Sequence, residues 1–244
     1  MENKSSDKTY KFFLDLYTVN INGVSAPCII AFSLAPGEKR NEKFKLYDFF
    51  LCYNDIGGYT DIELVFQVRQ TDKNGIEGAN VLERKAVHIY PYGEDKAAEF
   101  VREAQPSDKI ILDNEYATVI FVGEANEKYK ESFDREEYNF EMFVINKTDE
   151  MLRIDGAYDS FSVNGFKLES SSDSGWGAKV DGGKCSFSKM WFSKEDLEKY
   201  GIKDYEDFEE IKFKLQIKDF CIDDYGFYRN SNNLLGEYEI TLNP

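Results

Sequence analysis

Hydrophobic and polar residues alternate in two widely separated segments of the chain, residues 61–68 and 210–217. Alternation with a period of two is typical of a β-strand that buries one face. Residues 110–112, 117–122 and 138–145 are also rich in strand-forming residues, and turn-forming residues separate them. Short strands with turns every ~8–12 residues predict an antiparallel β-sandwich. The apolar positions of the alternating segments are Ile62, Leu64, Phe66 and Val68, and Ile211, Phe213, Leu215 and Ile217.

The same two segments belong to a longer internal repeat. Residues 19–23 match residues 161–165, and both end in Asn-Gly, which favours a tight hairpin turn because both residues tolerate positive φ. The matching segments follow one another in the same order in both halves of the chain, which predicts two diverged copies of one domain. The other matches pair residues 34–39 with 180–184, 61–68 with 210–217, and 82–91 with 235–244.

We therefore predict an all-β protein made of two antiparallel, immunoglobulin-like β-sandwich units. Residues 1–92 form a partial unit, and residues 108–244 form a complete one. Residues 93–107 form a linker, in which helix-forming residues precede Pro106 and predict a short helix.

A second short helix is predicted over residues 194–200, in the second unit. Ser193 is expected to cap its first turn, because Asp196 lies three positions later in a capping-box pattern. Gly201 is expected to end it, since glycine readily adopts the left-handed conformation that terminates helices.

The first unit begins where the second has an internal turn, because residues 2–8 align with residues 145–150. The strands expected over residues 109–143 have no counterpart before Met1, so the first sandwich lacks about three strands and leaves a sheet edge open. Two explanations are open. Either Met1 is a start inside a longer protein, which we favour, or another chain or the linker supplies an added strand. In the second case we expect a homo-oligomer that assembles through the edge of the first unit.

The net negative charge of the chain excludes some classes of binding partner. The 244 residues carry 46 acidic and 30 basic side chains, a formal net charge of −16, and residues 108–244 hold 30 of the acidic and 17 of the basic ones. Nucleic acid and anionic membranes are excluded as default partners, since phosphate binding requires a basic surface. No apolar run approaches the ~18 residues of a membrane span, and residues 1–6 contain no apolar signal core, so we expect no membrane insertion of this segment.

Catalytic chemistry is not expected. His88 is the only histidine, so any Ser-His-Asp, Cys-His or histidine-rich zinc site would depend on it. It alternates with Val87 and Ile89 on a predicted strand, so we expect its side chain to point away from the core. Nothing in the sequence indicates which residue could be its hydrogen-bond partner in catalysis. The acidic runs at 204–210 and 219–224 lack a calcium-loop pattern and predict a solvated surface. We predict no enzyme activity, no metal and no cofactor.

The four cysteines also carry no recognisable chemistry. None belongs to a C-x-x-C pair, and they do not occupy matching positions in the two copies. We predict buried thiols rather than a zinc site or a shared disulfide. The cysteines are Cys28, Cys52, Cys185 and Cys221.

Aromatic residues are the candidate ligand-binding groups. Trp176 lies in a Ser/Gly-rich stretch, residues 170–177, that predicts a loop, and Tyr225, Phe227 and Tyr228 follow the acidic run at 219–224. Exposed rings on sandwich loops can stack on sugars or anchor a protein partner. The alternative is that these rings close the ends of the core.

The turn and strand motifs of the second unit resemble those of a poorly characterised family, the tandem immunoglobulin-like β-sandwich repeat domains of exported or lipoprotein-type proteins of Gram-positive bacteria. The motifs, in order, are Leu112-Asp113-Asn114-Glu115, residues 143–149, Ser162-Val163-Asn164-Gly165, Gly182-Gly183-Lys184 and Glu209-Glu210-Ile211-Lys212-Phe213. The likeness covers residues 108–244, with a partial copy at 1–92. The family offers no catalytic residues to carry over.

The resemblance implies a non-catalytic binding or adhesion module of a bacterial exported or surface protein, with an unknown protein or a carbohydrate as its partner. An extracellular or cell-surface location is expected if the chain is a fragment, and a cytoplasmic one otherwise. The alternative function is an intracellular structural or regulatory protein that assembles through an open sheet edge of the first unit.

Overall fold

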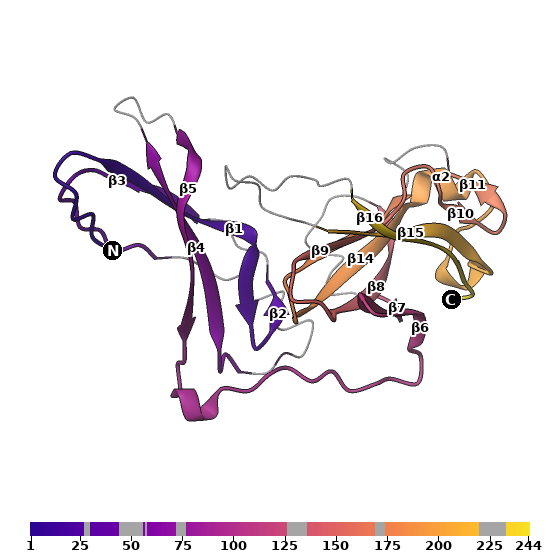
Figure 1. Cartoon of the computed structure of the whole chain (residues 1–244). Helices are drawn as coiled ribbons and strands as arrows, with labels where there is room; N and C mark the ends of the chain where they lie inside the picture. Colours follow the sequence, from indigo (N-terminus) through magenta and orange to yellow (C-terminus); the bar gives the residue numbers. More distant parts are fainter. Residues whose placement is uncertain are drawn as a thin grey trace. The chain divides into compact units, whose positions relative to one another are not determined.

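The computed structural model describes residues 1–26, 30–43, 56, 58–71, 77–125, 136–168, 174–219 and 233–244 (Figure 1). Nearly all elements among them are β-strands, so the predicted all-β class is confirmed. The described residues before Arg102 form one compact unit and those from Arg102 onward form a second, here termed unit 1 and unit 2. In the segment predicted as a linker, residues 93–107, the chain forms the 3-10 turn η1 (Glu94–Lys96).

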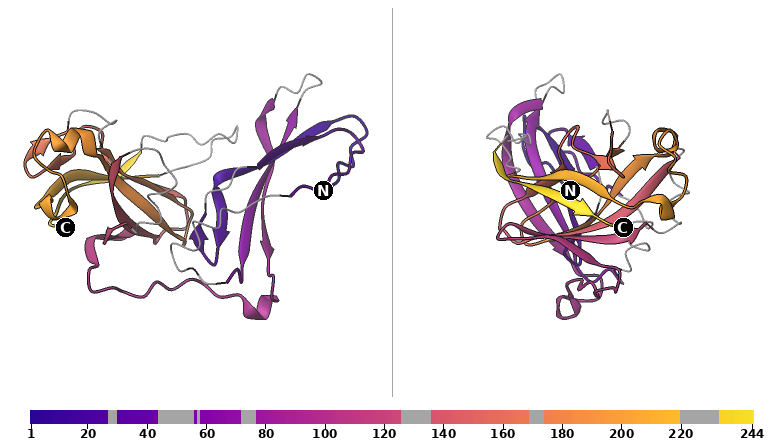
Figure 2. Two further views of the ribbon diagram at one scale, coloured as in Figure 1. Left: turned by 180° about the vertical axis from the view of Figure 1, so that it is seen from behind. Right: turned by 90° about the vertical axis from the view of Figure 1, so that its right-hand side faces the viewer.

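Unit 1 contains a single antiparallel sheet in its described part. Its order is β5-β4-β1-β3, and β2 pairs with the C-terminal end of β1. The strands β1, β4 and β5 are long and lie side by side (Figures 1 and 2). The strands are β1 (Thr9–Ile21), β2 (Val24–Ser25), β3 (Ile30–Leu34), β4 (Ile62–Thr71) and β5 (Glu77–Ile89).

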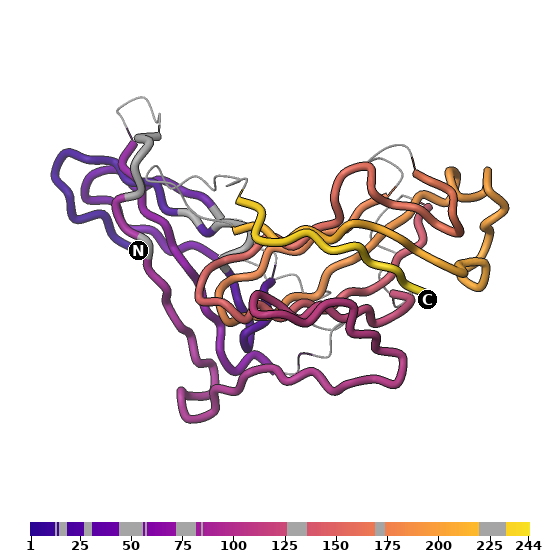
Figure 3. The backbone as a smooth tube through the Cα atoms, turned by 45° about the vertical axis from the view of Figure 1, so that its right-hand side comes forward, coloured from indigo at the N-terminus to yellow at the C-terminus, as the bar shows by residue number. Residues whose placement is uncertain are grey.

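Unit 2 contains two antiparallel sheets. In the first, β6, β7, β8 and β14 are neighbours in this order, and β12 adds to β14. In the second, β15 pairs on one side with β16 and on the other with β9 and β10, which β13 and β11 extend (Figure 3). The first sheet consists of β6 (Lys109–Asp113), β7 (Ala117–Glu124), β8 (Glu137–Asn146), β12 (Ser174–Gly175) and β14 (Cys185–Ser193). The second consists of β9 (Leu152–Gly156), β10 (Ser162–Val163), β11 (Phe166–Lys167), β13 (Gly177–Val180), β15 (Ile211–Asp219) and β16 (Leu234–Leu242).

The core of unit 2 joins apolar side chains from both sheets. The alternation predicted for residues 210–217 is confirmed, because the apolar residues of β15 are at most 1 % exposed while their neighbours face outward. Phe140 and Met142 of β8 belong to the same cluster as Phe213 and Leu215 of β15. Two sheets that bury their facing apolar sides form a sandwich-like arrangement. The immunoglobulin-like topology stays a prediction.

The predicted alternation of buried apolar and exposed polar residues is wrong for β4 in unit 1. Leu64 is buried as predicted, but Phe66 is only half-buried, and the polar residues Gln67 and Arg69 of the opposite face are 0 % and 2 % exposed. The Arg69 guanidinium donates to Gln67 Oε1 at 3.5 Å. The burial of a strand face depends on what packs against it, and the sequence of the strand alone does not specify that neighbour.

Both predicted Asn-Gly turns adopt the same backbone geometry. Asn22 and Gly23 have φ values of 51° and 83°, and Asn164 and Gly165 have values of 51° and 82°. Positive φ at both central residues is the requirement of a two-residue type I′ hairpin turn, and glycine meets it without strain at the second position. The backbone N–H of each asparagine also donates to the backbone carbonyl of the residue just before a long strand. Asn22 donates to Asp61 and Asn164 donates to Glu210, each at 2.8 Å.

The helix predicted at 194–200 is present as α2 (Lys194–Glu198). The Ser193 hydroxyl accepts the Asp196 amide, as the capping pattern predicts, and Gly201 has a φ of 83° after the last turn. A 3-10 turn, η3 (Tyr205–Asp207), follows. Backbone amides of Lys203 and Asp204 donate to the Asp207 carboxylate and hold its pKa below the ordinary value.

Candidate functional site

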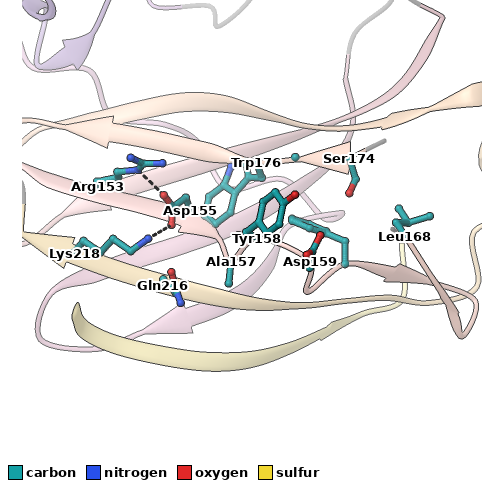
Figure 4. A pocket seen from close by; sticks show the side chains of 13 residues that line it. Arg153, Asp155, Ala157, Tyr158, Asp159, Leu168, Ser174, Trp176, Gln216 and Lys218 are labelled. Atoms are coloured by element: carbon teal, nitrogen blue, oxygen red, sulfur yellow. Dashed lines mark hydrogen bonds and ion pairs between the residues drawn. The ribbon is translucent and has the colours of Figure 1, made fainter. Parts of the chain in front are cut away.

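Unit 2 contains a pocket of about 440 Å³ at one end of its second sheet (Figure 4). Small-molecule sites span roughly 300–1,000 Å³, so this volume holds a ligand of a few rings. One part of its wall is polar and comes from β9 and β15, and the other part is mostly apolar and comes from the turns around them. The polar part consists of Arg153, Asp155, Gln216 and Lys218, and the other part includes Ala157, Tyr158, Phe161, Leu168 and Trp176.

The polar wall follows from strand alternation and register. Ile154 and Ile217 are fully buried in the core, so their neighbours along each strand project to the opposite face. The register sets Gln216 opposite Asp155 and Lys218 opposite Arg153, which brings four polar residues together from segments distant in sequence. These residues are Arg153, Asp155, Gln216 and Lys218.

Asp155 is the buried centre of this wall. It is 6 % exposed, and both of its carboxylate oxygens are engaged by cations. Arg153 Nε lies 2.5 Å from Oδ2, and Lys218 Nζ donates to Oδ1 at 3.1 Å. A buried carboxylate needs such partners, because an unpaired charge in a low-dielectric site is strongly destabilising.

Trp176 lies on the pocket wall but is not the exposed loop residue that the sequence suggested. Its exposed fraction is 5 %, and it belongs to the core cluster of unit 2. The indole Nε1 donates to Ser188 Oγ at 2.8 Å, and the ring meets Phe213 edge-on at a centroid distance of 6.0 Å. The expectation of an exposed ring is therefore wrong for Trp176, and the alternative, that the ring closes the core, is confirmed for this residue.

Among the described residues that line the pocket, Tyr158 is the exposed aromatic one, and sequence reasoning missed it. It is 72 % exposed in the turn after β9, and the next residue, Asp159, has a φ of 55°. A tyrosine before an aspartate that tolerates the left-handed region was the available signal for a ring at a turn. Tyr225, Phe227 and Tyr228, the other predicted ligand-binding residues, lie outside the described residues.

His88 has acidic partners that the sequence did not reveal. Its Nδ1 lies 2.8 Å from Asp61 Oδ1, its Nε2 lies 3.9 Å from Glu63 Oε1, and its ring stacks on Tyr90 at 5.7 Å. The pairing follows from the register of β4 with β5, which sets Glu63 opposite His88. The sequence nominated no partner because it does not reveal this register, and the side chain is exposed as predicted.

Strand alternation with His88 also predicted that Val87 and Ile89 face a core, but these residues are 39 % and 41 % exposed. In unit 2 the positions paired in the same way, Ile240 and Leu242, are 7 % and 2 % exposed. Strand phase therefore fixes which residues share a face, but not whether that face is covered.

In the part of the chain that the structure describes, no group of three or more His, Cys, Asp or Glu side chains could hold a metal ion. Of the four cysteines, only Cys185 lies among the described residues, on β14. No helix in the described ranges is both long and apolar enough to cross a membrane. Comparisons of the chain with protein-family models, with curated proteins and with solved structures give no match.

Proposed function

We propose that the protein acts by binding rather than by catalysis, and that the pocket of unit 2 takes a saccharide. The observation that carries the proposal is the combination, in one pocket, of an exposed aromatic ring and a pre-organised set of charged and amide groups. Ligand pockets usually combine such apolar surface with a few fixed polar groups that orient the ligand.

The chemistry of the wall favours a polyhydroxylated ligand. The face of Tyr158 offers apolar contact to a sugar ring, as aromatic side chains do when they are exposed beside a pocket. Gln216, Lys218 and Arg153 supply donors, and Asp159 and the Gln216 amide oxygen supply acceptors. The Asp155 carboxylate fixes both cations, so fewer rotamers are lost when a ligand binds.

The setting that we propose is an exported or surface-attached protein of a bacterium, in which such a module would serve adhesion or interaction. Its support is the resemblance of the turn and strand motifs in residues 108–244. A protein partner that places a polar side chain in the same pocket is an alternative ligand of the same site.

Titration of the labelled protein with a panel of saccharides tests the proposal by NMR. The panel contains neutral hexoses, N-acetylhexosamines and uronic acids. The chain has two tryptophans, so the indole N–H signals of Trp176 and Trp191 are easily resolved, and we expect binding to shift that of Trp176. If no saccharide of the panel shifts this signal, the proposal is wrong.

Variants of Tyr158 measure how much stacking on its ring contributes to the affinity for the saccharide. Tyr158→Ala should weaken binding about tenfold, whereas Tyr158→Phe, which keeps the ring face, should retain most of the affinity. Tyr92→Ala is the matched control, because Tyr92 is 66 % exposed and lies in unit 1. Equal binding by Tyr158→Ala and the control would exclude Tyr158 from the site.

A second candidate function is assembly through the sheet of unit 1, which would suit an intracellular structural or regulatory protein. The observation that favours it is the outer edge of β5, which pairs with no other strand among the described residues. An edge strand offers unpaired backbone donors and acceptors to another chain.

A further inference from the structure

The pocket of unit 2 has two chemically different ends. Arg153, Asp155 and Lys218 form the charged end, and Figure 4 shows Ser174 and Leu168 toward the other end. Leu168 is only 3 % exposed and belongs to the core cluster, yet it lines the pocket, so this end of the pocket borders the apolar core. A ligand that fills the whole pocket therefore needs a polar part and an apolar part.

The charged end favours a ligand without a net charge. The charged side chains that line the pocket are two cations, Arg153 and Lys218, and two anions, Asp155 and Asp159. Both carboxylate oxygens of Asp155 are paired with the two cations, so a carboxylate of a ligand would have to compete with Asp155 for them. An uncharged ligand leaves this balanced set of charges intact.

Ser174 adds one polar group to the apolar end. The register of β12 with β14 sets it opposite Phe192, a fully buried core residue, so its side chain points into unit 2. Ser174 is 5 % exposed, and none of the described residues forms a hydrogen bond with its hydroxyl. A buried hydroxyl without a partner is unfavourable, so a ligand group that forms a hydrogen bond with it gains affinity.

We propose that the apolar end of the pocket is a subsite for the acetamido group of an N-acetylhexosamine, with the methyl group against Leu168 and the amide hydrogen-bonded to the Ser174 hydroxyl. This rests on the proposed saccharide-binding function and deepens it by naming the class of sugar. An acetamido group is uncharged and joins one methyl group to one amide, which matches an apolar wall with a single hydroxyl. A hexose brings only a hydroxyl to this position, and a uronic acid adds a negative charge.

Matched pairs of sugars test the subsite in the full-length chain. Each pair is a hexose and its 2-acetamido derivative, in the gluco, galacto and manno series, and the dissociation constants come from NMR titration of the Trp176 indole signal. In the series that binds, we expect the acetamido derivative to bind about tenfold tighter than the hexose, which is the effect of one further apolar carbon in an apolar pocket. The uronic acid of the same series should bind no tighter than the hexose.

Ser174→Ala tests the position of the acetamido group. It should lower the ratio of the two affinities, that of the acetamido derivative over that of the hexose, about fivefold, because only the acetamido derivative loses a hydrogen bond. This ratio is the readout, since a general disturbance of the pocket weakens both sugars alike. Ser162→Ala is the matched control, because Ser162 lies on β10 in the same unit and does not line the pocket, and it should leave the ratio unchanged.

The outcomes separate the subsite from the function on which it rests. If no sugar of the panel binds, the saccharide proposal and the subsite are both overturned. If hexoses or uronic acids bind as tightly as the acetamido derivatives, the subsite is overturned and saccharide binding stands. A preference for acetamido derivatives that Ser174→Ala leaves unchanged, with circular dichroism confirming the fold, places the acetamido group elsewhere and also overturns the subsite.

Discussion

Asn3 in unit 1 and Asn146 in unit 2 share a matching set of four side-chain hydrogen bonds. Each side chain donates through Nδ2 to three backbone carbonyls and accepts, through Oδ1, the amide two positions later, that of Ser5 or Thr148. The asparagines are 2 % and 1 % exposed. The carbonyls belong to Lys8, Leu34 and Ala35 in unit 1, and to Glu150, Val180 and Asp181 in unit 2. The match supports the proposal that the units are diverged copies.

Because Asn146 joins two turns that are far apart in sequence, we expect Asn146→Ala to lower the free energy of unfolding of unit 2 by about 3 kcal/mol. Asn146→Asp should be at least as harmful, since a carboxylate keeps the acceptor but repels the three carbonyls. Urea unfolding measures both, and the exposed Asn243→Ala serves as the control. A loss below about 1 kcal/mol would show that water replaces these bonds.

Much of this fold follows from local sequence, and the candidate site does not. Asn-Gly turns, strand alternation in β15 and the cap of α2 depend on residues a few positions apart, and each is present. The contact of Lys218 with Asp155 joins residues 63 positions apart and exists only because β9 and β15 adopt one register. Single-sequence patterns do not fix such registers, so the polar wall of the pocket was not foreseen.

Gly182 and Gly183 form adjacent positions of one turn but resist substitution for different reasons. A Cβ on Gly182 would lie 2.1 Å from the Asp149 carbonyl oxygen, a backbone atom that cannot move aside. Gly183 has open space but a φ of 65°. We expect Gly182→Ala to lower the free energy of unfolding by about 3 kcal/mol and Gly183→Ala by only about 1 kcal/mol, measured by thermal or urea unfolding. Equal losses would contradict the steric argument.

Trp176 should behave as a core residue in stability measurements. Trp176→Ala removes a buried ring and is expected to lower the free energy of unfolding by about 3–5 kcal/mol. Ser188→Ala removes only the acceptor of the indole N–H and is expected to lower it by about 1 kcal/mol. If Trp176→Ala unfolds like the wild type in urea, the ring is not part of the core, and its direct contact with a ligand becomes the better interpretation.

The Arg102–Asp108 pair links the stability of unit 2 to pH. Two guanidinium nitrogens donate to the two carboxylate oxygens at 2.6 and 2.7 Å, and both side chains are about nine-tenths buried. The Arg102 hydrogen bonds hold the pKa of Asp108 below its ordinary value of 3.8, with a smaller contribution from the Gln105 amide. The pair therefore stabilises the folded state fully above this ordinary pKa, and the effect is lost as pH falls through the lowered one.

Asp108→Asn should consequently lower the free energy of unfolding by about 2 kcal/mol at pH 7, and the difference from the wild type should shrink as the pH falls below about 4. Urea unfolding at a series of pH values measures this difference. Asp113→Asn is the control, because the Asp113 side chain is 58 % exposed beside Lys147, and it should cause a smaller change at pH 7. A difference for Asp108→Asn that stays constant down to the acid limit would show that the carboxylate does not gain its stability from the ionised pair.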